Sequence, residues 1–230
     1  MIKQAIILAG GLGTRLRSAV PDLPKCMAPV AGKPFLEHVI DYFRQQGIDA
    51  FIFAVGYKSE IIIDFLNQRY PDLKMDFSIE KELLGTGGAI RFACNKAFVE
   101  NVLVLNGDTI FKIDLEKLST FHESEGADCS IVLKPMSRFD RYGVVEVSND
   151  RRIVSFKEKQ FYEQGLISGG VYALNVKSFM SEALPEKFSM EKDYLEALYN
   201  HRKMYGVVDE SYFIDIGIPT DYEQAQKDFQ

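Results

Sequence analysis

The chain has 230 residues, of which 47% are hydrophobic and 26% are charged, and its formal net charge is −6. This length and composition suit one large α/β domain or two small ones with an ordinary hydrophobic core. The acidic balance excludes a global basic field that would recruit nucleic acid, and no apolar run approaches the roughly 18 residues that a membrane span needs.

The first half of the chain alternates between strand and helix patterns. Four short apolar runs predict buried strands, at residues 5–8, 51–55, 75–79 and 102–105. Three stretches with apolar residues at helical spacing predict helices, at 35–46, 60–69 and 88–97. This alternation implies right-handed crossovers and a mostly parallel sheet.

After about Asp108, strand patterns become more frequent than helix patterns. Four segments favour strands, at 130–133, 143–147, 152–157 and 170–174, and the turn residues at 148–151 predict a hairpin. Helices are expected again near 176–182 and 191–200, and Pro219 is well placed to begin a last one. With no linker or repeat, we expect one domain over 1–230.

Cysteine and histidine are few and scattered. Cys26, Cys94 and Cys129 are odd in number and far apart, without a C-x-x-C pair. Neither a disulfide framework nor a zinc site is expected, and free thiols are typical of a reducing compartment. No basic segment and apolar stretch precede the first strand, so we expect a cytoplasmic protein.

The predicted strand at 5–8 leads directly into a segment of small residues that ends in a cation: Gly10, Gly11, Gly13, Thr14 and Arg15. Backbone N–H groups in such a segment can face an anion because few side chains shield them. The guanidinium of Arg15 suits phosphate, and Lys25 adds a second cation. We therefore infer a polyphosphate ligand, although a plain strand-to-helix turn would also use these glycines.

Two common glycine motifs do not fit this segment. The dinucleotide fingerprint G-x-G-x-x-G fails because Leu16 holds its third glycine position and no acid ends the strand at 51–55. The P-loop fails because Met27 holds its first glycine position and Pro34 its last.

A second glycine-rich segment lies at 84–89, with three glycines among four residues ahead of the predicted helix. A simple turn needs fewer glycines, so the pattern favours a loop whose backbone contacts a flat ring or a phosphate.

Two acids follow apolar strand patterns. Asp108 comes after the strand at 102–105, and ligands of open α/β sheets bind beyond the carboxyl ends of the strands. A carboxylate there suits Mg²⁺, although a turn acid is the alternative. Asp215 repeats the pattern within 212–217 and could converge on the same ion. The charged run at 156–159, by itself, is typical of an exposed strand edge.

Together these segments resemble the nucleotidyltransferases that make nucleotide-sugars, from Lys3 to about Phe229. The opening pattern of that family matches 10–16 and the Pro24-Lys25 pair, and its second glycine loop matches 84–89. Its two metal acids fall on Asp108 and Asp215, and its glutamate–lysine pair at the sugar falls on Glu158 and Lys159.

The resemblance implies a Rossmann-like three-layer α/β/α fold, similar to glycosyltransferase A, with a mixed, mostly parallel central sheet. It implies a nucleotide-binding half at 1–110 and a sugar-phosphate-binding half at 111–230. The reaction implied is the transfer of a nucleoside monophosphate from a nucleoside triphosphate to a sugar 1-phosphate, with release of pyrophosphate. Mg²⁺ would be held by Asp108 and Asp215.

The site residues implied fall into three groups. The catalytic ones are Arg15, Lys25 and Asp108. Those that bind the nucleotide are Leu8, Ala9, Gly10, Gly11, Gly13, Thr14, Arg15, Lys25, Glu80, Gly85, Thr86 and Gly87. Those that bind the sugar phosphate are Asn106, Gly143, Glu158, Lys159 and Gly170.

Within the family, the chain resembles the bacterial branch that transfers the guanylyl group of GTP to D-glycero-α-D-manno-heptose 1-phosphate for surface-polysaccharide synthesis. The similar segments are 27–30, 32–36, 133–136, 139–143, 156–159 and 212–217. Cys26 stands where that branch usually has proline. Glu80, Glu82 and carbonyls near Gly85 are candidate acceptors for guanine.

Other activities stay open at this point. One alternative is a uridylyltransferase or thymidylyltransferase acting on a hexose or amino-sugar phosphate, and another is a non-catalytic sensor of nucleotide-sugars. A metal-dependent glycosyltransferase would carry a D-x-D pair, whereas Asn106 holds its first position. The expected partners are the two substrates, without nucleic acid or membrane, and a homodimer is left open.

Overall fold

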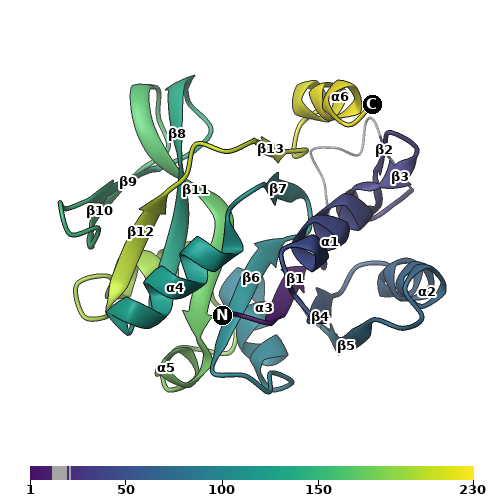
Figure 1. Ribbon diagram of the computed structural model, residues 1–230, viewed down its shortest axis with the longest axis horizontal. Helices are drawn as coiled ribbons and strands as arrows, with labels where there is room; N and C mark the ends of the chain where they lie inside the picture. Colours follow the sequence, from purple (N-terminus) through teal and green to yellow (C-terminus); the bar gives the residue numbers. More distant parts are fainter. Residues whose placement is uncertain (12–19, 21) are drawn as a thin grey trace.

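The computed structural model describes residues 1–11, 20 and 22–230 (Figure 1). Through this part of the chain runs a seven-stranded sheet in the order β12-β8-β11-β6-β1-β4-β5. Its strands are β1 (Gln4–Leu8), β4 (Ala50–Val55), β5 (Lys74–Ile79), β6 (Asn101–Asn106), β8 (Cys129–Phe139), β11 (Tyr162–Asn175) and β12 (Met204–Val208). Three two-stranded ribbons accompany it: β2 (Pro29–Val30) with β3 (Lys33–Pro34), β7 (Thr109–Phe111) with β13 (Phe213–Asp215), and β9 (Val144–Val147) with β10 (Ile153–Lys157).

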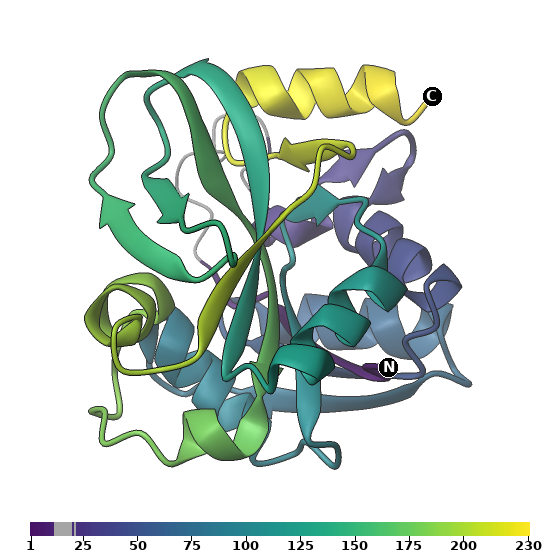
Figure 2. The ribbon, with the colours of Figure 1, turned by 60° about the vertical axis from the view of Figure 1, so that its left-hand side comes forward.

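The strand directions confirm a mixed, mostly parallel sheet. β1 pairs in parallel with β4 and β6, β4 with β5, and β8 with β12. β11 pairs antiparallel with both β6 and β8, so it alone runs against the other six strands of this sheet. Figure 2 shows β9 and β10 as a separate ribbon beside the long strands β8 and β11.

Helices cover both faces of the sheet and make three layers, as predicted. Within the described residues, the buried hydrophobic side chains form two large clusters. The helices that contribute to the first cluster are α1 (Phe35–Gln45), α2 (Ser59–Arg69), α4 (Leu115–Glu125) and α6 (Pro219–Asp228). Those of the other are α3 (Gly85–Cys94), α5 (Val176–Met180) and the π-helix η3 (Met190–Glu196). Alternate residues of a strand point to opposite faces, which is why Ile7 joins the first cluster and Ile6 the second.

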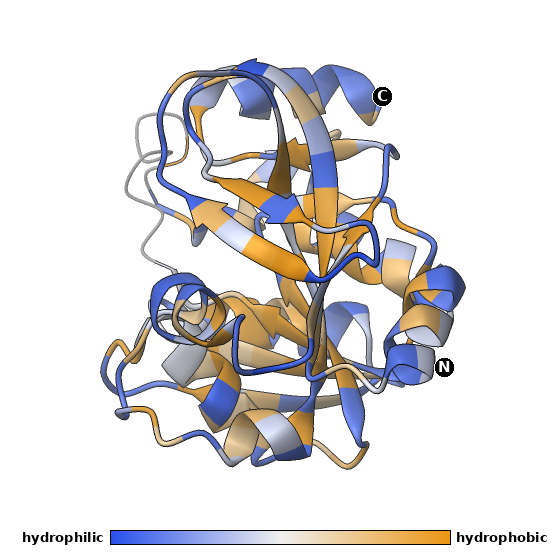
Figure 3. Ribbon diagram, turned by 90° about the vertical axis from the view of Figure 1, so that its left-hand side faces the viewer, coloured by the Kyte–Doolittle hydropathy of each residue, from blue (hydrophilic) through white to orange (hydrophobic). Residues whose placement is uncertain are grey.

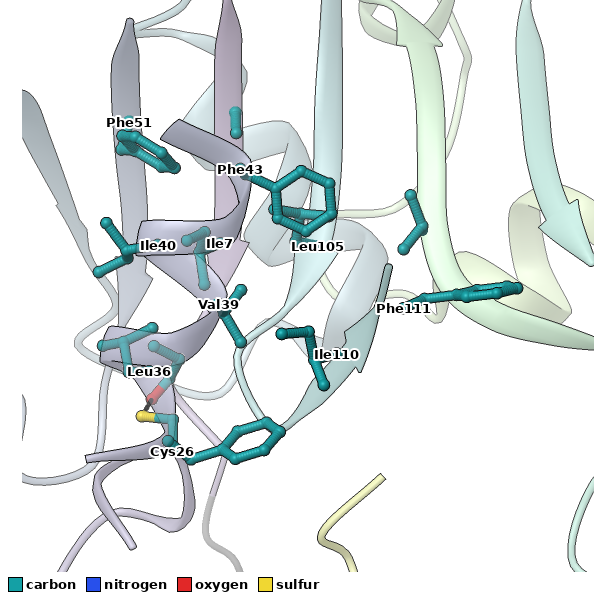
Figure 4. Close-up of a cluster of buried hydrophobic side chains, with 14 of the residues drawn as sticks. Ile7, Cys26, Leu36, Val39, Ile40, Phe43, Phe51, Leu105, Ile110 and Phe111 are labelled. Carbon is teal, nitrogen blue, oxygen red and sulfur yellow. Dashed lines mark hydrogen bonds between the residues drawn. The ribbon is translucent and has the colours of Figure 1, made fainter. Parts of the chain in front are cut away.

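The spacing of apolar residues explains how α1 packs. Leu36, Val39, Ile40 and Phe43 repeat at the period of a helix and are fully or almost fully buried. Figure 4 shows them against residues of three strands, among them Ile7, Phe51 and Leu105. Hydrophobic residues (orange in Figure 3) concentrate in the strands, whereas the C-terminal helix α6 is largely hydrophilic. No helix in the described ranges is both long and apolar enough to cross a membrane.

Some predicted elements were wrong or incomplete. The helix α4 and the strands β2, β3, β7 and β12 were not predicted, β8 and β11 are much longer than expected, and the helix expected at 191–200 is mainly the π-helix η3. The helix expected at 88–97 begins at Gly85, so the second glycine-rich segment is the first turn of α3 and not a loop.

The sequence does carry signals for the missed helix α4. The side chain of Asp114 accepts a hydrogen bond from the backbone N–H of Lys117 at 3.0 Å, which is an N-cap, and Gly126 ends the helix in the left-handed conformation.

Candidate active site

Two cavities open at the carboxyl ends of the parallel strands. The first, of about 490 Å³, is lined mainly by the ends of β1 and β4, the segment after β5 and the start of α3. The second, of about 450 Å³, lies between β9, β10, β11 and η3. Lys25, Asn106 and Asp108 line both cavities, so the two spaces share a wall.

The first cavity contains most of the residues predicted to bind the nucleotide. Those that line it are Leu8, Ala9, Gly10, Gly11, Lys25, Glu80, Gly85 and Thr86. The register of the sheet brings part of this wall together, because Leu8 pairs with Ala54 on β4 and with Asn106 on β6. Gly13, Thr14 and Arg15 lie outside the described residues, and the polyphosphate prediction at these positions stays a prediction.

The second glycine-rich segment packs against Phe188 and also lines part of the first cavity. Backbone N–H groups of Gly87 and Gly88 donate to the carbonyl oxygen of Phe188, at 3.0 and 3.3 Å. A Cβ at Gly85 would lie 2.5 Å from that oxygen, and one at Gly87 would overlap the Phe188 ring. Gly87 is buried and does not line the first cavity, whereas Gly85 and Thr86 do.

Glu80 places a carboxylate in the first cavity. It follows β5 directly, and its Oε2 accepts a hydrogen bond from the backbone N–H of Leu84 at 3.0 Å. Burial raises the pKa of Glu80 above its usual value, with the Leu84 hydrogen bond acting in the opposite direction. Glu82, the other predicted acid, is exposed and does not line the cavity.

The second cavity contains every residue predicted to bind the sugar phosphate: Asn106, Gly143, Glu158, Lys159 and Gly170. Gly170 has a φ of +70°, and a Cβ there would lie 2.5 Å from Asn106 Nδ2. A Cβ at Gly143 would lie 2.5 Å from the carbonyl oxygen of Lys157. Both glycines are therefore required for the close packing that shapes this wall.

At the shared wall, one lysine contacts two aspartates. Nζ of Lys25 forms an ion pair with Asp108 and lies 3.2 Å from Oδ1 of Asp215. The side chain of Lys25 is 13% exposed, and those of Asp108 and Asp215 are 31% and 22% exposed. Three charges thus meet in a partly desolvated space, which strengthens their interaction.

The β7–β13 ribbon explains how two distant acids come together. Asp215 pairs with Thr109 across this ribbon, and the N–H of Ile216 donates to the carbonyl oxygen of Asp108 at 3.1 Å. Lys25 reaches them from the short 3₁₀ helix η2 (Lys25–Met27). Asp108 and Asp215 therefore both contact one cationic atom, Nζ of Lys25, and their sharing of a metal ion stays a prediction.

Several residues that line the second cavity were not predicted as site residues. Tyr142 donates a hydrogen bond to Oδ2 of Asp215 at 3.4 Å, and Arg141 forms an ion pair with Asp221 at 2.6 Å. Burial, with the negative charge of Asp215, raises the pKa of the Tyr142 phenol and keeps it a hydrogen-bond donor. Arg141 and Tyr142 lie within residues 139–143, a segment that resembles the heptose-phosphate branch of the family, and this resemblance is the sequence signal that could have identified them.

Comparison with known proteins shows the family to which the chain belongs. The family model for the nucleotidyl transferases matches residues 4–230. The chain is 50% identical over 227 residues to D-glycero-alpha-D-manno-heptose 1-phosphate guanylyltransferase of Aneurinibacillus thermoaerophilus, covering 99% of this chain and 98% of that protein. It is 49% identical over 220 residues to the protein of the same name from Campylobacter jejuni, covering 95% and 96%.

Solved structures agree as well. HddC from Yersinia pseudotuberculosis superposes with a TM-score of 0.89 at 38% identity, covering all of both chains. The same protein complexed with GMP-PN gives a TM-score of 0.88 at 37% identity, again over both whole chains. On the match to the family model and on these identities, the chain belongs to the nucleotidyl transferase family.

Proposed function

We propose that the protein transfers GMP from GTP to D-glycero-α-D-manno-heptose 1-phosphate and releases pyrophosphate. The observation that carries this proposal is the wall shared by the two cavities at Lys25, Asn106 and Asp108. A nucleotide in the first cavity and a sugar 1-phosphate in the second would bring their phosphates together at that wall. The names of the 50% and 49% identical relatives support the choice of both substrates.

The reaction asks the protein to position groups and to neutralise charge. An oxygen of the sugar phosphate attacks the α-phosphorus of GTP, and the bond from that phosphorus to the oxygen shared with the β-phosphate breaks. The attacking oxygen is already ionised at neutral pH, so no general base is required. Holding the two reactants in line can contribute about 7–11 kcal/mol in favourable cases.

Lys25 is well placed to serve both substrates. Among the described residues, it is the cation that lines both cavities. We propose that its ammonium group neutralises phosphate charge at the α-phosphate, and that Arg15 acts at the departing pyrophosphate.

The two aspartates fit a divalent ion. Both carboxylates already lie within reach of one cationic atom, Nζ of Lys25. In the described part of the chain no third histidine, cysteine or acid completes a cluster with them, which suits Mg²⁺, because this ion commonly takes one or two carboxylates together with phosphate oxygens and water. We propose that Asp108 and Asp215 hold Mg²⁺, which when bound would offset negative charge on the phosphates.

Base and sugar recognition are assigned to opposite cavities. The N1–H and N2–H₂ groups of guanine are donors, and Glu80 supplies a carboxylate acceptor in the first cavity. In the second cavity, Lys159 would bind the sugar phosphate and Glu158 the sugar hydroxyls. GTP and sugar phosphates are made in the cytoplasm, where we propose that the reaction takes place.

A substrate panel tests the proposal. Pyrophosphate release is measured for GTP, UTP, dTTP and ATP, each with D-glycero-α-D-manno-heptose 1-phosphate, mannose 1-phosphate and glucose 1-phosphate. We expect the highest kcat/KM for GTP with the heptose phosphate. Preference for UTP or dTTP with a hexose phosphate would refute the guanylyl assignment, and binding without turnover in every combination would indicate a sensor.

A further inference from the structure

Glu191 lines the second cavity from the first turn of η3, and it was not predicted as a site residue. The hydroxyl groups of three residues donate hydrogen bonds to its carboxylate. Thr86 Oγ1, on α3, and Ser189 Oγ, just before η3, each donate to Oε2 at 3.1 Å. The hydroxyl of Tyr172, on β11, donates to Oε1 at 3.5 Å. These contacts fix the side chain in one position.

The contact between α3 and η3 makes this position possible. Thr86 Oγ1 also accepts a hydrogen bond from the backbone N–H of Met190 at 2.9 Å, and the N–H of Phe188 donates to the carbonyl oxygen of Leu84 at 3.0 Å. Close approach of the 186–188 segment depends on the glycines of α3, since a Cβ at Gly88 would lie 2.5 Å from the carbonyl oxygen of Glu186. The second glycine-rich segment therefore helps to place an acid in the other cavity.

The remaining acceptor capacity of Glu191 points to a neutral donor. An ionised carboxylate offers about four acceptor positions, and the three protein donors leave about one of them, on Oε1. All three donors are uncharged hydroxyls, and no ion pair to Glu191 occurs among the described residues. A carboxylate has no hydrogen-bond donor to offer a phosphate, whereas it can accept from a hydroxyl group. The phosphate of a bound sugar would therefore lie at Lys159, facing the shared wall, and the sugar hydroxyls would lie toward Glu191.

Glu158, the acid predicted for sugar binding, is less well fixed. It is exposed at the end of β10, and within the described residues its carboxylate makes no hydrogen bond or ion pair. An acceptor that is already held in place loses less conformational entropy on binding than one that must be ordered. Glu191 is therefore the better preorganised acceptor of the two.

We propose that Glu191 is a specificity-determining residue that accepts a hydrogen bond from one hydroxyl of the sugar 1-phosphate, away from the anomeric phosphate. The inference rests on the proposed function, sugar-phosphate nucleotidyl transfer in the second cavity. Sites that are built to bind a particular hydroxyl discriminate against analogues that lack it, because one acceptor position in the site is then unpaired.

The test compares Glu191→Gln with Glu186→Gln, an exposed acid on the neighbouring segment whose side chain makes no hydrogen bond or ion pair in the described structure. Glu191→Gln is expected to raise KM for the sugar 1-phosphate about tenfold to a hundredfold, the range for losing a hydrogen bond to a charged group. KM for GTP should change less than twofold, and Glu186→Gln should match the wild type. An unchanged sugar KM, or an equal rise in both KM values, would overturn the proposal.

Substrate analogues separate hydroxyl recognition from a purely structural role. With the wild type, one monodeoxy sugar 1-phosphate should lose about as much in kcat/KM as Glu191→Gln does with the full substrate. With Glu191→Gln, that analogue should lose much less than with the wild type, because the neutral amide oxygen accepts this hydrogen bond more weakly than the carboxylate. Additive losses for every analogue would contradict the assignment.

A second variant covers the case in which Glu191→Gln fails to fold. Ser189→Ala removes one donor but keeps the carboxylate, and it should raise the sugar KM about three- to tenfold with KM for GTP unchanged; an unaltered sugar KM would reject the proposal. If the wild type uses no sugar 1-phosphate at all, the proposed function fails. If the wild type turns over normally and Glu191→Gln does too, only the assignment of Glu191 fails.

Discussion

Replacing Lys25 by methionine should destabilise the protein, because it removes the cation between two partly buried acids. At an effective dielectric constant of about 20, the 3.2 Å separation from Asp215 corresponds to about 5 kcal/mol of Coulomb attraction before desolvation. Desolvation offsets most of this, and the 13% exposure of Lys25 lies between the exposed and the fully buried cases. We expect a loss of about 2 kcal/mol, or about 4–8 °C in Tm for a chain of this size.

Thermal unfolding of matched variants measures this loss. Lys96→Met removes an exposed lysine that lies 3.3 Å from Asp76, with side chains 41% and 60% exposed, and should cost no more than about 0.5 kcal/mol. Adding Asp215→Asn to Lys25→Met should recover part of the stability, because it removes the repulsion between the two carboxylates. Millimolar Mg²⁺ should raise the Tm of Lys25→Met more than that of the wild type. A Tm of Lys25→Met equal to that of Lys96→Met would refute the reasoning.

Three further predictions concern recognition, pH and packing. Lys159→Ala should raise KM for the sugar 1-phosphate at least tenfold and leave KM for GTP within twofold in steady-state kinetics; the opposite pattern would exchange the roles of the two cavities. Burial lowers the pKa of His122 to about 4, so its contribution to stability is complete above pH 6.5 and is lost as the pH falls toward 4. Urea unfolding at pH 7 and pH 5 should differ by about 2 kcal/mol more in the wild type than in His122→Gln, and equal differences would contradict this. Gly87→Ala should cost about 1–3 kcal/mol in the same assay because its Cβ overlaps Phe188, whereas Gly56→Ala, with its nearest neighbour at 3.5 Å, should cost less; equal losses would rule out the overlap.

The longer strands and helices of the first half could be predicted because each has a clear local pattern of apolar residues. α1 and β4 were expected at 35–46 and 51–55 and occur at Phe35–Gln45 and Ala50–Val55, since their apolar residues repeat at the period of a helix or form one continuous run. The second half was harder. β11 is fourteen residues long and contains Gly165, Gly169 and Gly170, which interrupt the strand pattern and are required by contacts with other elements.

In the candidate site, too, residues with a local sequence pattern could be predicted, whereas contacts between distant segments could not. Asp108 and Asp215 could be predicted because each follows an apolar strand, but their proximity depends on the β7–β13 pairing, of which the sequence gives only a faint sign. The glycines at 85–88 were interpreted as a ligand loop because a sequence does not show which segment packs against them, and that segment is 186–188. Glu191 was missed because two of its donors, Thr86 and Tyr172, lie 105 and 19 residues away in the sequence, and only the fold brings them to its carboxylate.

Asp108→Asn tests most directly whether the transfer takes place at the shared wall. Binding of GTP and of the sugar 1-phosphate is measured by calorimetry, and pyrophosphate release by rapid quench in a single turnover. Retained binding of both substrates within about tenfold, with a turnover rate at least a hundredfold lower, is the expected result, because this carboxylate lines both cavities and would hold the divalent ion. A near-normal rate in Asp108→Asn would place the chemistry elsewhere and contradict the proposed site.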